Sequence, residues 1–439
     1  MSNSVKSTEA LKKLTALFDD GTFTEIDAFA KDADGNIDLV AGYGFVNGAP
    51  CYAFAQDSSI NGGAVTVAQC SKICKILDLA KKTGCGVVGI YDSNGVKLTE
   101  GFEVLNAYGD VVKAASSLSG VVAQVSVIDG ACLGTSALLA NLADVVIATK
   151  GSDFYITAPS ETTVEDNASA GTIDVVCDDI SAAIEQAKNI VCMLPQNNLC
   201  VPEVNFEYSA PAVSAAEGAS TEDIVNSILD STVSVEFKAD YGKNVITKLG
   251  TVDGCTVGIV AFKNDKICPA CAYKAEAMIK LCDAFNIPVI TVADCTGFVK
   301  DADTQMLVAA TKLTTAYAST TSPKISLITG QAIGCPYIIL AGKGANADVT
   351  LAWDNAVASP LDVEAAVAFL YNDRLAKGED RAALEAEYKE TVGSAFTAAA
   401  CGAVDDVFPA GETRTKISQY LDMLASKRET TIPRKHSVK

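Results

Sequence analysis

Apolar and polar positions alternate in two stretches of the chain, and each stretch has a turn signal at its centre. The first, NIDLVAGYGFVNGAPCYAFAQD, turns at Asn47-Gly48, and the second, NVITKLGTVDGCTVGIVAFKND, turns at Asp253-Gly254. Asn-Gly and Asp-Gly accept the positive φ angles that a two-residue hairpin turn requires. The pattern therefore predicts one β-hairpin in each half of the chain.

Each hairpin is followed by the same series of patterns. A helical segment ends in KICKILDLAKKTG or AEAMIKLCDAFN, and a continuous apolar run follows, CGVVGIYDSNG or IPVITVADCTGF. Continuous apolar runs are typical of parallel strands that are buried on both faces. Amphipathic helices are then predicted at 103–118 and 303–319, each followed by another strand and a glycine turn. We interpret the chain as an internal repeat of one α/β unit built on a ββα pattern.

The two halves are separated by a segment without hydrophobic periodicity. This segment, NNLCVPEVNFEYSAPAVSAAEG, is rich in Pro, Asn and Ser, which is typical of a linker. We predict two domains, residues 1–210 and 211–439.

The charge and histidine content exclude several classes of function. With 34 basic and 54 acidic residues, the net charge of −20 disfavours binding to nucleic acid, which needs clustered Lys and Arg. The single histidine, His436, lies near the C-terminus, so a Ser-His-Asp catalytic triad or a multi-histidine metal site is not expected. We predict no metal site.

The cysteines and the apolar segments indicate the cellular compartment of the protein. No apolar run resembles a signal peptide or a membrane span, and 15 cysteines occur at irregular spacing. We therefore expect free thiols and a cytoplasmic protein. Cys268 and Cys271 form a CxxC motif, and Cys70 and Cys74 lie one helical turn apart. We interpret both pairs as buried or inert thiols, with a redox or metal role as the alternative for the CxxC motif.

Two kinds of turn recur in both halves and are candidates for chemistry. Asp92–Gly95 and Asp294–Gly297 end one strand of each half, and Gly130–Ser136 and Gly330–Pro336 join the next strand to a helix. Such turns can aim backbone N–H groups at a phosphate or a developing oxyanion, although a glycine can also simply end a strand. Neither a dinucleotide fingerprint nor a P-loop falls on these turns, and no carboxylate pair suggests acid–base chemistry.

At these motifs the chain resembles the carboxyltransferase component of biotin-dependent acyl-CoA carboxylases and decarboxylases. The resemblance spans nearly the whole chain, and its most specific parts are FAQD with a trailing Gly-Gly and the C-terminal PRKH. It is also carried by LFDDGTFTEID, GIYDSNGVKLTEG and LCDAFNIPVITVADCTGF. The resemblance implies two tandem crotonase-like domains, the first binding acyl-CoA and the second binding biotin.

The resemblance also implies a mechanism that needs no side-chain base. In that family carboxybiotin releases CO2, the ureido anion takes the α proton of the thioester, and the enolate attacks CO2. Two oxyanion holes made of backbone N–H groups stabilise the anions. The implied catalytic residues are Gly134, Thr135, Gly334 and Cys335. The implied substrate contacts are Gly62, Gly63, Asn94, Gly95 and Ile338, and the implied biotin contacts are Cys335, Gly297 and Phe298.

The same resemblance implies the partners. Biotin would arrive on a separate biotin carboxyl carrier protein, together with a biotin carboxylase or with membrane subunits of a decarboxylase. The chain would assemble as a dimer of trimers, with active sites between subunits. The acyl group and the direction of transfer stay open.

Several departures from the family pattern fall at the turns. Pro336 has no N–H, Thr135 replaces a glycine, and the family segments that follow Glu161 and Ser359 are absent. Three functions therefore stand as hypotheses: a carboxyltransferase subunit, a non-catalytic paralogue with a structural or regulatory role, and an enzyme of another CoA-thioester reaction. The third is disfavoured because no paired glutamates stand at the turns.

Overall fold

The computed structural model describes residues 8–202 and 206–431. The chain forms two compact units, Met1–Pro202 and Glu203–Lys439, and each is considered separately below. The predicted boundary at 210/211 lies in the same stretch between the last helix of the first unit and the first helix of the second. No helix among the described residues is long and apolar enough to cross a membrane.

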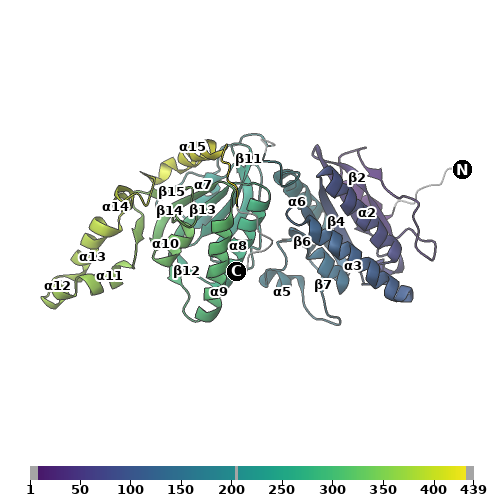
Figure 1. The fold of residues 1–439 in the computed structure, drawn as a ribbon, viewed down its shortest axis with the longest axis horizontal. Helices are drawn as coiled ribbons and strands as arrows, with labels where there is room; N and C mark the ends of the chain where they lie inside the picture. The colour runs from purple at the N-terminus through teal and green to yellow at the C-terminus, as the bar shows by residue number, and fades with distance from the viewer. Residues whose placement is uncertain (1–7, 203–205, 432–439) are drawn as a thin grey trace. The chain divides into compact units, whose positions relative to one another are not determined.

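The first unit alternates strands with helices after an opening hairpin (Figure 1). Its elements are α1 (Glu9–Leu17), β1 (Thr24–Glu25), β2 (Leu39–Val46), β3 (Ala49–Gln56), the 3-10 turn η1 (Asn61–Gly63), α2 (Val67–Thr83), β4 (Gly86–Ser93), η2 (Leu98–Glu100), α3 (Gly101–Leu118), β5 (Gln124–Leu133), α4 (Thr135–Ala140), β6 (Val145–Thr149), β7 (Asp153–Tyr155), α5 (Val164–Ser169), β8 (Val175–Cys177) and α6 (Ile180–Met193).

The second unit repeats this series and adds a group of helices near its end. Its elements are α7 (Thr221–Ile228), β9 (Ser234–Glu236), β10 (Val245–Val252), β11 (Cys255–Phe262), β12 (Asp265–Ile267), α8 (Pro269–Ala284), β13 (Val289–Phe298), α9 (Asp303–Ser319), β14 (Lys324–Ile333), α10 (Cys335–Leu340), β15 (Val349–Trp353), β16 (Val357–Ser359), α11 (Val363–Leu370), α12 (Asn372–Ala376), α13 (Arg381–Tyr388), the π-helical turn η3 (Lys389–Gly393), α14 (Ala395–Ala400), β17 (Asp406–Phe408), η4 (Ala410–Glu412) and α15 (Thr413–Leu424).

The two sheets have the same topology. In the first unit the strand order is β1-β2-β3-β4-β5-β6-β8, with β7 beside β5. In the second it is β9-β10-β11-β13-β14-β15-β17, with β16 beside β14 and one additional short strand, β12, beside β13. The opening strands pair antiparallel, and from β3 or β11 onward the pairing is parallel. The predicted internal repeat is confirmed, because the two halves build the same sheet from the same order of elements.

Both predicted hairpins are present. Asn47 and Gly48 have φ angles of 47° and 83°, and Asp253 and Gly254 have φ angles of 54° and 79°. The Asp19 carboxylate accepts the N–H groups of Asn47 and Gly48 at 2.9 and 2.8 Å, which fixes the first turn.

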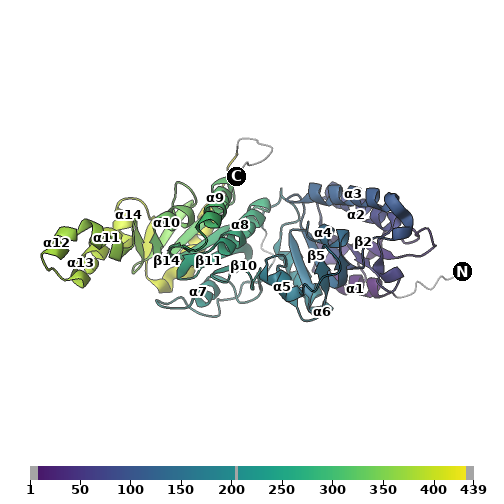
Figure 2. The same ribbon diagram turned by 90° about the horizontal axis from the view of Figure 1, so that it is seen from below.

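Helices cover both faces of the first sheet. Helices α2 and α3 pack side by side on one face, while α1 and α6 lie on the other (Figure 2). The predicted helices at 103–118 and 303–319 correspond to α3 and α9. The layered packing explains the continuous apolar runs, because β4, β5, β13 and β14 are shielded from water on both faces.

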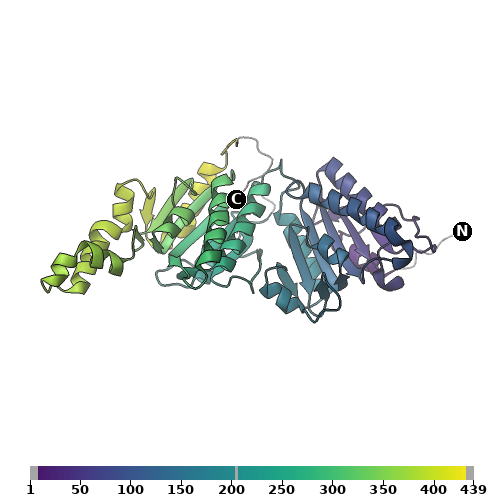
Figure 3. The same ribbon diagram turned by 60° about the horizontal axis from the view of Figure 1, so that its bottom comes forward.

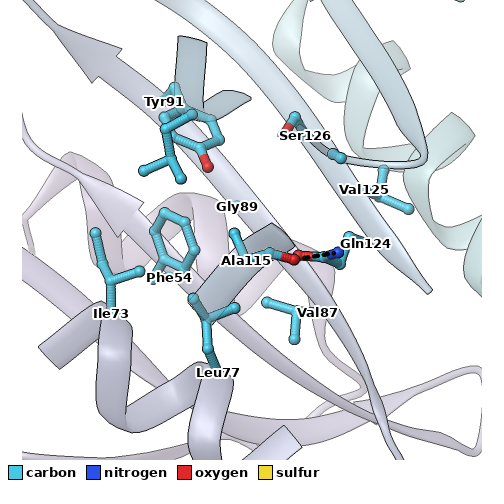
Figure 4. A pocket seen from close by; sticks show the side chains of 12 residues that line it. Phe54, Ile73, Leu77, Val87, Gly89, Tyr91, Ala115, Gln124, Val125 and Ser126 are labelled. Atoms are coloured by element: carbon cyan, nitrogen blue, oxygen red, sulfur yellow. Dashed lines mark hydrogen bonds between the residues drawn. The ribbon is translucent and has the colours of Figure 1, made fainter. Parts of the chain in front are cut away.

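The first unit encloses a small cavity between its sheet and these helices (Figure 4). It measures about 20 Å³ and lies beside Gly89, where an added Cβ would come within 2.6 Å of the Phe54 ring. Gln124 closes one side by donating from its side-chain amide to the carbonyl oxygen of Ala115 at 3.1 Å. This volume holds about one water molecule, so the cavity is a packing defect and not a substrate site.

Helices α11 to α13 form a separate small core in the second unit. Ala366, Val367, Leu384 and Tyr388 are buried together there. These helices project from the unit's sheet as a group (Figure 3). The helix α13 buries only the Leu384 and Tyr388 side chains.

Candidate active site

Two glycines with the same unusual backbone conformation mark equivalent positions in the two units. Gly134 precedes α4 with φ 61° and ψ −122°, and Gly334 precedes α10 with φ 60° and ψ −128°. Residues with a Cβ avoid this region of φ and ψ. The two turns therefore have the same backbone structure, one in each unit.

The N–H groups of these glycines are already used. Gly134 donates to the carbonyl oxygen of Tyr155 at 3.0 Å, and Gly334 donates to that of Ser359 at 2.8 Å. Thr135 and Cys335 come next and begin their helices, so their N–H groups have no acceptor within the helix. Of the four predicted catalytic residues, the two glycines shape the turns, and the other two carry the available N–H groups.

A carboxylate braces each turn from the neighbouring strand. Asp92 accepts the N–H of Ala131 at 3.3 Å, and Asp294 accepts that of Gln331 at 2.8 Å. An added Cβ on Gly130 or Gly330 would lie 2.4 or 2.3 Å from the same carboxylate oxygen. The glycines are thus needed for this close approach. The sequence showed both aspartates, but their bracing role required the strand register.

The two braces differ in their electrostatic surroundings. Near Asp92, the Lys13 ammonium lies 3.9 Å from its carboxylate and 2.7 Å from that of Asp129. Burial raises the pKa of Asp294 above its ordinary value, and the hydrogen bond from Gln331 opposes the rise only in part.

Four of the predicted substrate contacts meet at one edge of the first sheet. The N–H of Asn94 donates to the carbonyl oxygen of Gly62 at 3.1 Å, and that of Val65 donates to Gly95 at 2.8 Å. Gly63 packs so closely that an added Cβ would lie 2.0 Å from the Asp92 carbonyl oxygen. Gly62, Gly63, Asn94 and Gly95 are therefore brought together in the fold.

A chain of hydroxyl groups joins this edge to the α4 turn. The Tyr108 hydroxyl lies 2.6 Å from that of Ser136, which donates to the Ser93 hydroxyl at 3.3 Å. Burial raises the pKa of Tyr108, so its hydroxyl stays protonated. The Gly62–Gly63 segment, the end of β4 and the start of α4 thus form one edge of the unit.

In the second unit the turn borders a large, mainly apolar cavity of about 700 Å³. The predicted residues Gly334, Cys335 and Ile338 line it, and Ile338 is 54% exposed. The rest of the lining comes from Tyr337, Ala358, Ser359, Pro360, Val392, Thr397, Ala398, Cys401 and Ala403. The wall supplied by residues 392–403 had not been predicted, because tertiary contacts bring it to the turn, among them the hydrogen bond from the Tyr337 hydroxyl to the carbonyl oxygen of Ala403 at 3.0 Å.

Two predicted biotin contacts do not line this cavity. Gly297 and Phe298 lie at the end of β13, where Phe298 pairs with Ile267 of β12. The neighbouring strand β14 leads to Gly334, since Cys295 pairs with Ala332. These two residues therefore lie on a strand next to the one that leads to the Gly334 turn, but they lie outside the cavity.

Pro336 occupies the second position of α10 and is buried. In α4 the first helical hydrogen bond is donated by Leu138 to Gly134, which leaves three earlier N–H groups, those of Thr135, Ser136 and Ala137. In α10 the equivalent bond runs from Ile338 to Gly334, and Pro336 reduces the three groups to two. The second turn thus offers one N–H group fewer than the first.

No cluster of three or more potential metal-ligating residues occurs among residues 8–202 and 206–431. His436 and the PRKH tail fall outside the described residues.

Comparison with known proteins places these features in a family. The model of the carboxyl transferase domain matches residues 7–438. The chain belongs to the carboxyl transferase domain family. This confirms the resemblance drawn from the sequence motifs.

Named members of the carboxyl transferase family match along nearly their whole length. The chain is 32% identical to the methylmalonyl-CoA decarboxylase subunit alpha of Propionigenium modestum, over 97% of this chain and 92% of the relative. It is 30% identical to a biotin-dependent acetyl-/propionyl-coenzyme A carboxylase beta5 subunit of Mycobacterium tuberculosis, over 97% and 88%. The fold matches the transcarboxylase 12S hexamer with methylmalonyl-coenzyme A bound, with a TM-score of 0.88 and 29% identity over 98% of this chain and 91% of that one. The predicted tandem crotonase-like α/β fold is confirmed.

Proposed function

We propose that this chain is a carboxyltransferase subunit that moves a carboxyl group between biotin and an acyl-CoA. The observation that carries the proposal is the pair of equivalent glycine turns, at Gly134 and Gly334, in a member of the carboxyl transferase family. Two anions need to be held in this reaction, and the chain has one backbone turn for each.

In the first unit, Thr135 is the proposed donor to the thioester oxygen. Its N–H lies at the start of α4, and the Gly134 turn is held by Tyr155 and braced through Asp92. Gly62, Gly63, Asn94 and Gly95 form the adjoining edge, where we place the acyl-CoA. A rigid donor stabilises the enolate oxygen more than the neutral thioester oxygen, which lowers the barrier to proton removal.

In the second unit, Cys335 is the proposed donor to the ureido oxygen of biotin. The cavity beside it, of about 700 Å³, has the volume for the bicyclic ring, and Ile338 lines it from the α10 side. Biotin, carried by a separate protein, supplies the carboxyl group. The residues at the start of α10 fit biotin, but they offer it one N–H group fewer than the start of α4 would, because Pro336 has no N–H.

The proposed partners follow from the family. They are a biotin carboxyl carrier protein, with a biotin carboxylase or membrane decarboxylase subunits. The proposed assembly is a dimer of trimers, in keeping with the hexamer of transcarboxylase 12S, and the proposed location is the cytoplasm.

A second candidate function is that of a non-catalytic paralogue that stabilises or regulates an active complex. Pro336 favours it, because loss of one oxyanion donor typically costs about 10²–10³ in rate.

Carboxyl transfer by the purified full chain separates the two candidates. The protein would be incubated with malonyl-CoA or methylmalonyl-CoA and a biotinyl carrier protein, and carboxylated biotin would be measured by mass spectrometry. Transfer above a protein-free control supports the carboxyltransferase. No transfer, with retained assembly with a complete carboxyltransferase, would overturn it in favour of the paralogue.

A further inference from the structure

Two thiols face each other at the start of α8. Cys268 is the N-cap residue of this helix, and its sulfur accepts the N–H of Cys271 at 3.3 Å. The sulfur atoms of Cys268 and Cys271 lie 2.8 Å apart, and all fifteen cysteines of the chain are free thiols. The two sulfurs are thus placed for bond formation without moving the helix.

The two thiols are chemically unequal. Cys268 is half-buried, whereas Cys271 is fully buried. The hydrogen bond from the Cys271 thiol and the N–H groups that begin the helix hold the pKa of Cys268 below its ordinary value. The same pairing, together with burial, raises the pKa of Cys271. Cys268 is therefore the accessible thiolate and Cys271 the protected thiol, which is the division of roles that thiol–disulfide exchange needs.

A buried lysine lies beside the pair. Lys274 follows Cys271 by three positions on α8, is 2% exposed, and its ammonium has no hydrogen-bond partner among the described residues. Burial lowers the pKa of Lys274 to about 8, while the negative charge of Glu236 opposes this shift. A buried cation without a partner is costly, and negative charge on the pair would reduce that cost.

We propose that Cys268 and Cys271 form a redox-active dithiol that exchanges with low-molecular-weight disulfides. The Cys268 thiolate attacks one sulfur of the small disulfide, forms a mixed disulfide and releases one small thiolate. Cys271 then attacks the Cys268 sulfur, its proton leaves with the second small thiol, and an intramolecular disulfide remains. The protein loses two electrons, and the small disulfide is reduced to two thiols.

The dithiol adjoins the strand end that carries Phe298. Ile267, the residue before Cys268, pairs with Phe298 and accepts the N–H of Val299 at 3.0 Å. The proposal stands independently of the proposed carboxyl transfer, because it needs only the second unit's own residues.

Peptide mapping of the native full-length protein after incubation with oxidised glutathione tests the proposal. After acid quenching and alkylation, we expect a Cys268–Cys271 disulfide. The matched pair Cys70 and Cys74, one turn apart inside α2, should stay reduced. A native protein in which Cys268 stays reduced under these conditions would overturn the proposal.

Two variants and one rate test the roles of the thiols. Cys271→Ser should accumulate glutathione on Cys268, whereas Cys268→Ser should leave Cys271 unmodified. In the wild type, iodoacetamide should modify Cys268 about tenfold faster than Cys335, although Cys335 is the more exposed thiol. The proposal would be contradicted if the more exposed Cys335 reacted with iodoacetamide faster than Cys268. It would also be contradicted if the Cys271→Ser variant folded but formed no mixed disulfide with glutathione.

Discussion

Pro336 removes an N–H group from the turn that borders the apolar cavity. Pro336→Ala restores this group at the second position of α10, where alanine is a good helix former. If the missing donor limits the rate, carboxyl transfer to or from biotin should rise, by up to about 10²-fold. The measurement is kcat with a biotinyl carrier. Pro269→Ala, which makes the same change at the first position of α8, outside this cavity, is the control and should leave the rate unchanged.

Thr135 offers the complementary experiment. Thr135→Pro removes this N–H together with the side-chain hydroxyl, at a first helical position where proline is tolerated. We expect kcat to fall about 10²–10³-fold with little change in thermal stability. Thr135→Ala keeps the N–H and is the matched control. Equal rates for the two variants would show that this N–H does not hold the reacting oxygen.

Asp144 makes the first unit sensitive to pH. Burial raises the pKa of its carboxyl group to about 7, although the N–H groups of Gln124 and Gly120 oppose the rise. The folded state thus binds this proton more tightly than the unfolded chain does. Its contribution to stability is complete below about pH 4 and is lost as the pH rises through about 7.

This linkage predicts a measurable loss of stability between pH 6 and pH 8. In urea unfolding, we expect a difference of about 1–2 kcal/mol between these pH values that disappears in Asp144→Asn. The equivalent residue of the second unit, Asp348, has an ammonium partner, Lys427, at 2.8 Å. Asp348→Asn is therefore the control and should retain the difference. A wild type without pH dependence would contradict the assignment to Asp144.

At the scale of elements, an arginine ties the last helix to the second hairpin. Arg414 of α15 lies 2.7 Å from Asp230 and 2.8 Å from Asp253. Asp230, whose side chain is fully buried, also accepts the N–H of Gly254 at 2.9 Å. In the first unit Asp19 takes the same position, and no salt bridge to it is found among residues 8–202 and 206–431. The arginine is therefore a difference between the two repeats.

Removing the Arg414 cation should destabilise the folded protein. Arg414→Met should lower the free energy of unfolding by about 2–4 kcal/mol, because the buried Asp230 loses its partner. Lys416→Met, which breaks the more exposed pair with Asp406 on the same helix, should cost no more than about 1 kcal/mol. Chemical denaturation monitored by circular dichroism measures both. Equal losses would show that the burial of Asp230 does not set the effect.

At the scale of the whole molecule, the two units share one topology but differ in their turns. The first has three available N–H groups at α4, and the second has two at α10 together with a cavity and an extra group of helices. The two proposed half-sites are therefore unequal, which suits a reaction with two different substrates. The same inequality is what a paralogue that has lost one half-reaction would show.

The proposed assembly is open to a direct measurement. Light scattering coupled to size-exclusion chromatography should give the mass of six chains, as in the transcarboxylase 12S hexamer that matches this fold. The control is a concentration series, since a specific hexamer should keep its mass on dilution. A monomer at all concentrations would remove the basis for active sites between subunits.

The sequence by itself determined the repeat, the hairpins at Asn47-Gly48 and Asp253-Gly254, and the buried parallel strands. These follow from local turn chemistry and from hydrophobic period, which neighbouring residues record directly. It also located the Gly134 and Gly334 turns, because only glycine adopts their backbone conformation.

Only the tertiary structure decided which groups are free to act there. The N–H groups of both glycines are taken by Tyr155 and Ser359, residues of strands that arrive later in the chain. The braces at Asp92 and Asp294, the cavity wall at 392–403 and the burial of Lys274 also depend on packing between distant segments. Hydrogen-bond satisfaction and burial are properties of that packing, and no single stretch of sequence contains them.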